Sequence, residues 1–130
     1  MFRLKGRVQV NPTEDLEKVK AAVENVLGNL EFKFRAEREK GTMLFTSLTQ
    51  DSLSKFKRIV RQDLIRDAVR SHLKARIEGG RIRFFLNKQV AYAGHISLCD
   101  PEGESPLGPI EIEIECSDPG GLVNWLTEKA

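Results

Sequence analysis

The segment that most constrains the fold is residues 110–116, where isoleucine alternates with glutamate before Cys116. Successive side chains of a strand point to opposite faces, so this pattern predicts a strand with one buried face and one charged face. Residues 2–10 alternate in the same way, with apolar side chains between Arg3, Lys5, Arg7 and Gln9. Strands that are wet on one face only predict an α+β fold of two layers, an antiparallel or mixed sheet with helices packed on one face.

A first helix is predicted after the first strand. Asn11 is the expected N-cap, Pro12 the first helical residue, and Glu14 stands three residues after the cap. An apolar stripe follows at helical spacing, and Gly28 is expected to end the helix in the left-handed conformation. Gly6, in the buried register of the strand, is expected to mark a bulge or a close approach of another group.

The rest of the chain completes the expected order of elements. The turn signal Glu39-Lys40-Gly41 predicts a hairpin, and Asp118 is a candidate helix cap. The predicted elements are strands over 30–34, 43–49, 81–86 and 95–99, a helical turn over 87–93 closed by Gly94, and a last helix over 121–128. We expect residues 1–130 to form a single α+β domain, since this length can bury a sizeable core.

Basic residues gather in one segment and acidic residues in another. The formal net charge is only +2, yet residues 52–77 contain eight basic and two acidic residues, and residues 101–130 contain seven acidic and one basic residue. One long helix is predicted over residues 53–76, ended by Gly79-Gly80. Its buried apolar side is expected to contain Leu53, Phe56, Val60, Leu64, Ala68 and Leu73. Four of its cations fall at multiples of four residues and would form one ridge: Arg58, Arg66, Arg70 and Lys74.

The basic helix is the first candidate site. Its cations would contact RNA phosphates through Lys55, Lys57, Arg58, Arg61, Arg66, Arg70 and Lys74, helped by Arg81, Arg83 and Lys88. The alternative is a solvated helix face in which Asp63 pairs with Arg66 and Asp67 pairs with Arg70. The excess of cations favours binding, because this segment has too few acids to neutralise them.

The acidic strand has a structural explanation. Arg3, Lys5 and Arg7 would lie opposite Glu111, Glu113 and Glu115 if the first and last strands are neighbours on the wet face of the sheet. Metal binding is the weaker alternative, since alternate side chains of a strand lie about 6 to 7 Å apart and do not converge. A face with these glutamates would repel phosphate, so we expect RNA at the helix.

The polar residues Asn87, Lys88 and Gln89 interrupt an apolar run and form the second candidate site. Two amides and an ammonium at a strand end could hold a phosphate or a base edge, with Tyr92 stacking and His95 assisting. In the structural alternative, Asn87 caps the short turn, Lys88 extends its amine toward solvent, and Gln89 satisfies backbone groups where the strand stops. The sequence leaves both interpretations open.

Three motifs together resemble the archaeal UPF0201 proteins: Asn11-Pro12-Thr13-Glu14-Asp15, Leu86-Asn87-Lys88-Gln89 and Pro106-Leu107-Gly108-Pro109-Ile110. The similarity covers nearly the whole chain, and Val90 departs from the alanine associated with the family. The resemblance implies a fold similar to that of the ribosomal protein that contacts 5S RNA, a homodimer, and an RNA-binding role without an established mechanism. It implies no catalytic residue.

Enzymatic function is less expected than binding. The sequence has no GxxxxGK, GxSxG or HExxH motif, and an acid–base pair of His95 with Glu102 and Glu104 would require the proline-rich loop to fold over the polar motif. The alternatives to a non-enzymatic RNA-binding protein are a small-ligand or enzymatic site around Asn87, Lys88, Gln89 and His95, and a dimeric scaffold for protein partners.

The cysteine count and the hydropathy pattern suggest a cytoplasmic protein. Cys99 and Cys116 are too few for a disulfide framework, and no apolar run has the length of a membrane span. Zinc bound by these cysteines with His72 and His95 is a further metal alternative. We expect no metal, no cofactor and no membrane partner.

Overall fold

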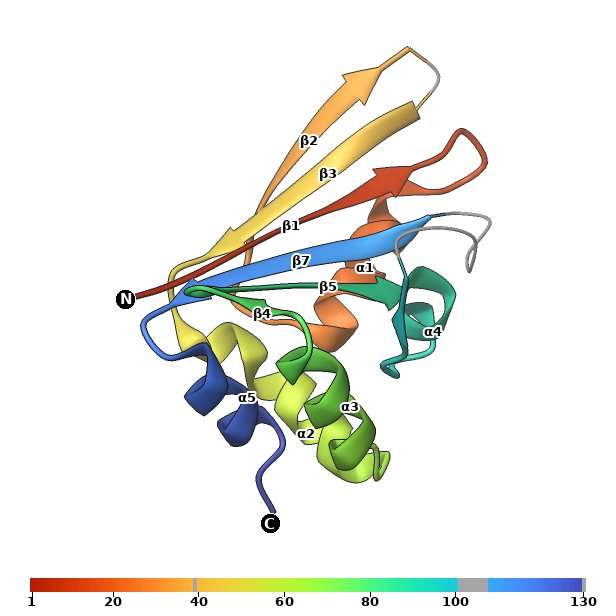
Figure 1. Ribbon diagram of the computed structural model, residues 1–130. Coiled ribbons are helices and arrows are strands. Elements are labelled where there is room, and N and C mark those ends of the chain that lie inside the picture. The colour runs from red at the N-terminus through yellow and green to blue at the C-terminus, as the bar shows by residue number, and fades with distance from the viewer. Residues whose placement is uncertain (39, 101–107, 130) are drawn as a thin grey trace.

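The computed structural model describes residues 1–38, 40–100 and 108–129, and it has two layers, a sheet and a set of helices on one of its faces (Figure 1). The strands are β1 (Phe2–Val10), β2 (Glu31–Glu37), β3 (Lys40–Ser47), β4 (Ile77–Glu78), β5 (Arg81–Asn87), β6 (Leu98–Cys99) and β7 (Pro109–Cys116). The helices are α1 (Leu16–Val26), the short 3-10 helix η1 (Gln50–Leu53), α2 (Ser54–Gln62), α3 (Arg66–Lys74), α4 (Lys88–Tyr92) and α5 (Pro119–Leu126). The predicted α+β class is confirmed.

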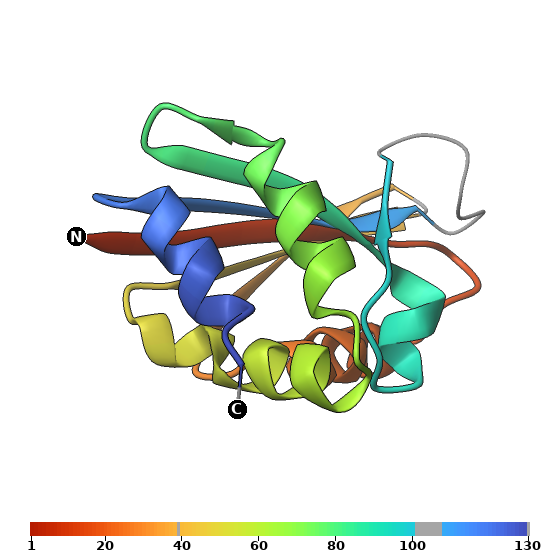
Figure 2. The same cartoon turned by 60° about the horizontal axis from the view of Figure 1, so that its bottom comes forward.

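The strands form one antiparallel sheet in the order β2-β3-β1-β7-β5-β4, and β6 pairs with β5. Its centre is the pair of β1 and β7, the two strands whose alternation is clearest in the sequence. Arg3 lies opposite Glu115, Lys5 opposite Glu113, and Arg7 opposite Glu111. The register places these charged side chains on one face of the sheet, and their exposure identifies it as the face opposite the helices. The helices cover the other face (Figure 2).

The core lies between the sheet and the helices. Leu4, Ile112 and Phe84 are fully buried on the inner face of the central strands, and Phe56 of α2 packs edge to face on Phe84 with 5.9 Å between ring centroids. Gly6 allows a close approach, as predicted, because a Cβ atom at this position would collide with the Phe45 ring of β3.

The first helix begins and ends elsewhere than predicted. Its N-cap is Asp15, whose carboxylate accepts a hydrogen bond from the Glu17 N–H at 2.9 Å, and not Asn11. Residues 11–14 form a turn instead, closed by the Glu14 N–H and the Asn11 carbonyl at 2.9 Å. Asn29, with φ of 53°, takes the left-handed conformation that was expected of Gly28.

The long basic helix is also divided. A Schellman motif ends α2, in which the Leu64 N–H donates to the Arg61 carbonyl and the Ile65 N–H to the Val60 carbonyl. Leu64 is left-handed, with φ of 57°, and its side chain points to solvent rather than to the core. After this break the apolar stripe changes phase, so Val69 is buried where Ala68 was expected.

The elements near the C-terminus follow the predictions closely. Asn87 caps α4 through a hydrogen bond from the Val90 N–H, Gly94 is left-handed with φ of 82°, and Asp118 caps α5. The strand expected over 95–99 is shorter than predicted, since β6 contains only Leu98 and Cys99. The loop acids Glu102 and Glu104 lie outside the described residues.

Candidate nucleic-acid interface

Two of the predicted phosphate-contacting cations are held within the protein. Lys55 Nζ donates a hydrogen bond to the Glu24 carbonyl at 2.8 Å. Lys57 Nζ lies 2.6 Å from Glu128 Oε1 and 4.3 Å from the centroid of the Trp125 ring. The hydrogen bond from Lys57 also lowers the pKa of Glu128. Both amines stabilise the fold, so their availability to an external phosphate is reduced.

The other five cations of the predicted set are placed differently. Within the described ranges, none of their side chains forms a hydrogen bond or an ion pair: Arg58, Arg61, Arg66, Arg70 and Lys74. Arg66 is partly buried and the other four are exposed. The solvated alternative required ion pairs of Asp63 with Arg66 and of Asp67 with Arg70, and neither forms among these residues. These cations therefore have no salt-bridge partner among the described residues, and Glu128 interacts with Arg61 only at longer range.

The predicted ridge of four cations on one helix is wrong. The left-handed Leu64 separates Arg58, on α2, from the later cations. Arg66, Arg70 and Lys74 keep their spacing of four residues on α3 and still form a row. The basic surface thus consists of a row on α3 and the exposed arginines of α2, on two sides of a turn.

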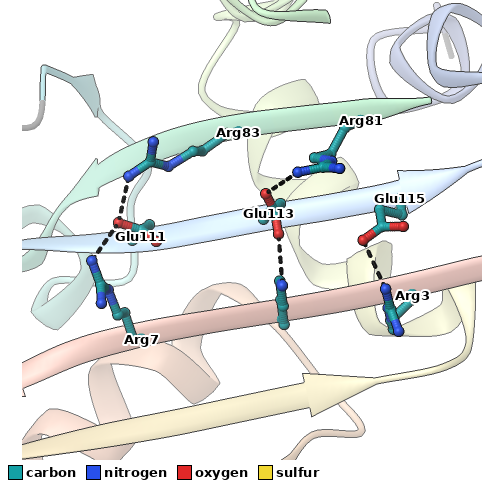
Figure 3. Close-up of polar contacts among 8 residues, drawn as sticks. Arg3, Arg7, Arg81, Arg83, Glu111, Glu113 and Glu115 are labelled. Carbon is teal, nitrogen blue, oxygen red and sulfur yellow. Dashed lines mark hydrogen bonds and ion pairs between the residues drawn. The ribbon is translucent and has the colours of Figure 1, made fainter. Parts of the chain in front are cut away.

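The open face of the sheet has the opposite arrangement, in which cations are paired with carboxylates (Figure 3). Glu113 lies 3.0 Å from Lys5 and 3.6 Å from Arg81, measured between the closest oxygen and nitrogen atoms. In the same way Glu111 lies 3.4 Å from Arg7 and 3.1 Å from Arg83. The expected pairing of β1 with β7 is confirmed, and β5 adds a second basic row that the sequence did not place.

Within these ion pairs, the basic side chain is more exposed to solvent than the glutamate. The side chain of Lys5 is 55% exposed, whereas that of Glu113 is 15% exposed. Arg3 donates a hydrogen bond to Glu115 at 2.8 Å, which lowers the pKa of the carboxyl and raises the pKa of the guanidinium. Arg81 and Arg83, which were predicted to help the basic helix contact phosphates, already have the acidic partners Glu113 and Glu111 within the sheet.

The Asn87-Lys88-Gln89 motif has mainly a structural role. The Lys88 side chain is fully buried rather than extended toward solvent, and its Nζ donates to the Gln9 carbonyl at 2.8 Å and to Glu14 Oε1 at 2.9 Å. Asn87 Oδ1 accepts the hydrogen bond that caps α4, and Gln89 is exposed. Lys88 is thus inaccessible both as a phosphate contact and as part of a ligand site.

Glu14 is the centre of this buried polar cluster. Its carboxylate accepts hydrogen bonds from the Asn11 N–H at 3.0 Å, from Asn11 Nδ2 at 2.7 Å and from the Tyr92 hydroxyl at 3.2 Å. Burial tends to raise the pKa of Glu14, but the hydrogen bonds of Asn11 and Lys88 outweigh it and leave the pKa below its usual value. Burial and the negative charge of Glu14 raise the pKa of Tyr92 to about 12.

His95 follows α4 in the chain, but its side chain contacts the α2–α3 turn rather than the polar motif. Its Nδ1 lies 2.8 Å from Asp63 Oδ2, and its side chain is 59% exposed. In the described part of the chain, no three histidine, cysteine or acidic side chains come together as a metal site would require. The zinc alternative with His72, Cys99 and Cys116 is therefore not supported by the geometry.

Comparison with known proteins identifies the family. A family model described as RNA binding matches residues 3–116. A UPF0201 protein of Metallosphaera sedula is 41% identical over 131 residues, which cover 99% of this chain and 90% of that protein. The chain belongs to the UPF0201 family. Another UPF0201 protein, from Sulfurisphaera tokodaii, is 43% identical, with 99% of this chain and 89% of that protein covered.

The UPF0201 fold is also known from a solved structure. The crystal structure of the UPF0201 protein from Methanococcus jannaschii matches with a TM-score of 0.86 and 26% identity, covering 96% of this chain and 98% of that chain. The resemblance noted in the sequence is thus confirmed, whereas the likeness to the ribosomal protein that contacts 5S RNA stays a prediction. None of the helices in the described ranges combines the length and apolar character that a membrane crossing requires.

The sequence did not indicate the roles of two residues, Leu64 at the α2–α3 turn and Glu14 in the buried polar cluster. Leu64 was assigned to the core, and its exposure became evident only with the break between α2 and α3. Glu14 was assigned to a helix cap, although its contact with Lys88 joins residues 74 positions apart. The only sequence signal for the contact between Glu14 and Lys88 is that both residues lie in motifs typical of the family.

Proposed function

We propose that this UPF0201 protein is a non-enzymatic, cytoplasmic RNA-binding protein that contacts phosphates through α2 and α3. The observation that supports this most is the set of five cations without ion pairs among the described residues: Arg58, Arg61, Arg66, Arg70 and Lys74. By contrast, the cations of β1 and β5 are matched with glutamates of β7. The family model described as RNA binding supports RNA as the class of ligand.

Phosphate is the chemical group that this surface suits. Guanidinium groups bind phosphate oxygens with two parallel hydrogen bonds, and four of the five cations are arginines. Arg66, Arg70 and Lys74 extend along about 12 Å of α3, since a helix rises about 1.5 Å per residue. Such contacts would set the position of an RNA backbone without reading its sequence.

The buried polar cluster argues against a catalytic role for the Asn87-Lys88-Gln89 motif. Lys88, Glu14 and Asn87 use their polar groups to hold α4 against the turn that follows β1. A catalytic role for this motif would need at least one of these groups to reach a substrate, and the burial of Lys88 opposes that. We therefore assign no catalytic residue.

Charge reversal on α3 tests the proposal. The double variant Arg66→Glu/Arg70→Glu should lose affinity for single-stranded and hairpin RNA, measured by fluorescence anisotropy at several salt concentrations. If Arg66 and Arg70 each neutralise one phosphate, the slope of log affinity against log salt should become shallower by about 1.4 for a single strand. The circular dichroism spectrum should stay unchanged, because neither side chain is in the core.

The chain offers a matched control for net charge. Lys33 and Arg35 are exposed on β2, and Lys33→Glu/Arg35→Glu changes the net charge by the same amount. This control should reduce affinity much less than the α3 variant. Equal reductions in both variants, or full affinity after reversal of Arg66 and Arg70, would contradict a specific α2–α3 interface.

A homodimer stays part of the proposal. Strand β2 is an edge of the sheet, and Phe34 on it is 48% exposed. Edge strands with unpaired backbone groups are common sites of association between chains. Light scattering coupled to size exclusion would give the mass, and a monomeric mass at working concentration would remove the dimer from the proposal.

A further inference from the structure

The residue that joins α2 to α3 has an unusual combination of conformation and exposure. Leu64 has φ of 57°, and its side chain is 87% exposed. Among the described residues, the other non-glycine positions with positive φ are Asn29 and Arg38. Asparagine tolerates this conformation, and Arg38 lies at the tip of the β2–β3 hairpin. Leucine has neither explanation.

Neither local conformation nor core packing explains a leucine at this position. A side chain with a Cβ atom is strained in the left-handed conformation, and glycine is the residue that usually ends a helix in this way. The exposed isobutyl group gains almost no burial in return. An exposed apolar group that the fold does not require is a candidate contact for a ligand.

The backbone around Leu64 is held in place by several contacts. The Leu64 N–H donates to the Arg61 carbonyl at 3.3 Å, and the Ile65 N–H donates to the Val60 carbonyl at 3.2 Å. Next to this turn, Asp63 is bound to His95 at 2.8 Å. Leu64 is thus presented by a turn with defined geometry between α2 and α3, and this turn lies at the end of the two helices that is away from the sheet (Figure 1).

The surroundings of Leu64 favour a nucleic acid as the ligand. Arg61 precedes it by three residues and Arg66 follows it by two, and neither forms an ion pair within the described ranges. An exposed apolar residue that is flanked in the sequence by two arginines without ion pairs among the described residues suits an RNA segment that presents a base between two phosphates. Sequence-tolerant binding of RNA combines phosphate contacts with unstacked bases held on aromatic side chains or guanidinium planes, and Leu64 would offer an apolar surface to such a base.

We propose that Leu64 packs against an unstacked RNA base while Arg61 and Arg66 contact the phosphates on either side. The preferred RNA would contain a bulge or a single-stranded loop, because bases inside a continuous duplex are stacked and do not reach this side chain. This inference rests on the proposed RNA-binding function, and it adds the class of RNA and an apolar contact.

The test uses two substitutions that suit a left-handed position, Leu64→Gly and Leu64→Asn. Both should keep or raise the melting temperature, because they relieve backbone strain and remove no core packing. Both should weaken binding to a bulged hairpin RNA by about tenfold, as the removal of one base contact predicts, and should weaken binding to a blunt RNA duplex less than about twofold. The salt slope should not change, since no charge is altered.

Leu48 is a matched control, because it is 74% exposed but lies between β3 and η1. Leu48→Asn should leave the affinity for both RNAs unchanged. Equal affinity of wild type and Leu64→Gly for the bulged RNA would overturn the base contact while leaving the phosphate interface intact, and would point to a protein partner for Leu64. Equal weakening on bulged and duplex RNA would also overturn it. Absence of RNA binding by the wild type would refute the proposed function and this inference together.

Discussion

The buried contact of Lys88 with Glu14 predicts an unequal response to removal of its two partners. The side chains are 0% and 6% exposed. Lys88→Met keeps the length of the side chain, and Glu14 retains its donors on Asn11 and Tyr92. We expect a loss of about 1.5–3 kcal/mol in the free energy of unfolding, the value of hydrogen bonds to a charged group. Glu14→Ala instead leaves an ammonium buried beside the Gln9 carbonyl, and should cost about 3–5 kcal/mol.

Urea unfolding of the two single variants and the double variant, followed by circular dichroism at pH 7, measures this difference. The double variant contains no buried charge at this site, so its cost should be smaller than the sum of the single costs by about 0.5–3 kcal/mol. Burial already lowers the pKa of Lys88. In Glu14→Ala this pKa should fall further, and stability should rise with pH because the unfolded chain then holds more protons. Additive costs, or a smaller cost for Glu14→Ala than for Lys88→Met, would refute the reasoning.

The remaining predictions concern packing, acid stability and domain structure. Gly6→Ala should destabilise the protein by about 1–3 kcal/mol, because the added methyl group collides with Phe45 and the Glu111 carbonyl, and urea unfolding would show this as a lower midpoint. The lowered pKa values of Glu14, Glu115 and Glu128 stabilise the folded state above pH 4.5, and this contribution should be lost as the pH falls below it, which thermal melts between about pH 7 and 3 would detect. A single domain should unfold in one transition with the same midpoint by fluorescence of Trp125 and by circular dichroism.

Strands were the part of the fold that the sequence determined best. The period of two in β1 and β7 indicated both their burial and their pairing, because basic and acidic side chains alternate in matching register. The same logic located the hairpin of β2 and β3. Local caps were also predictable where an asparagine or aspartate side chain had one obvious backbone partner, as at Asn87 and Asp118.

The errors have identifiable physical causes. The break at Leu64 could not be predicted from the sequence, because its helix end uses leucine where glycine or asparagine is expected. Asn11 was a plausible cap, but Glu14 turns back toward Lys88 and Asn11, and the helix starts at the next carboxylate along the chain, Asp15. Contacts between residues far apart in the chain decide both outcomes, and such contacts leave no local pattern.

The position of β7 also determines when the sheet can form during synthesis. It is inserted between β1 and β5, and Phe2 lies opposite Cys116. Until residue 116 has left the ribosome, β1 can pair only with β3. Strand β5 cannot yet join the sheet of β1, β2 and β3, because β7, which lies between β1 and β5, is missing. Closing so long a loop is entropically costly, so we expect the centre of this sheet to assemble late and as one step.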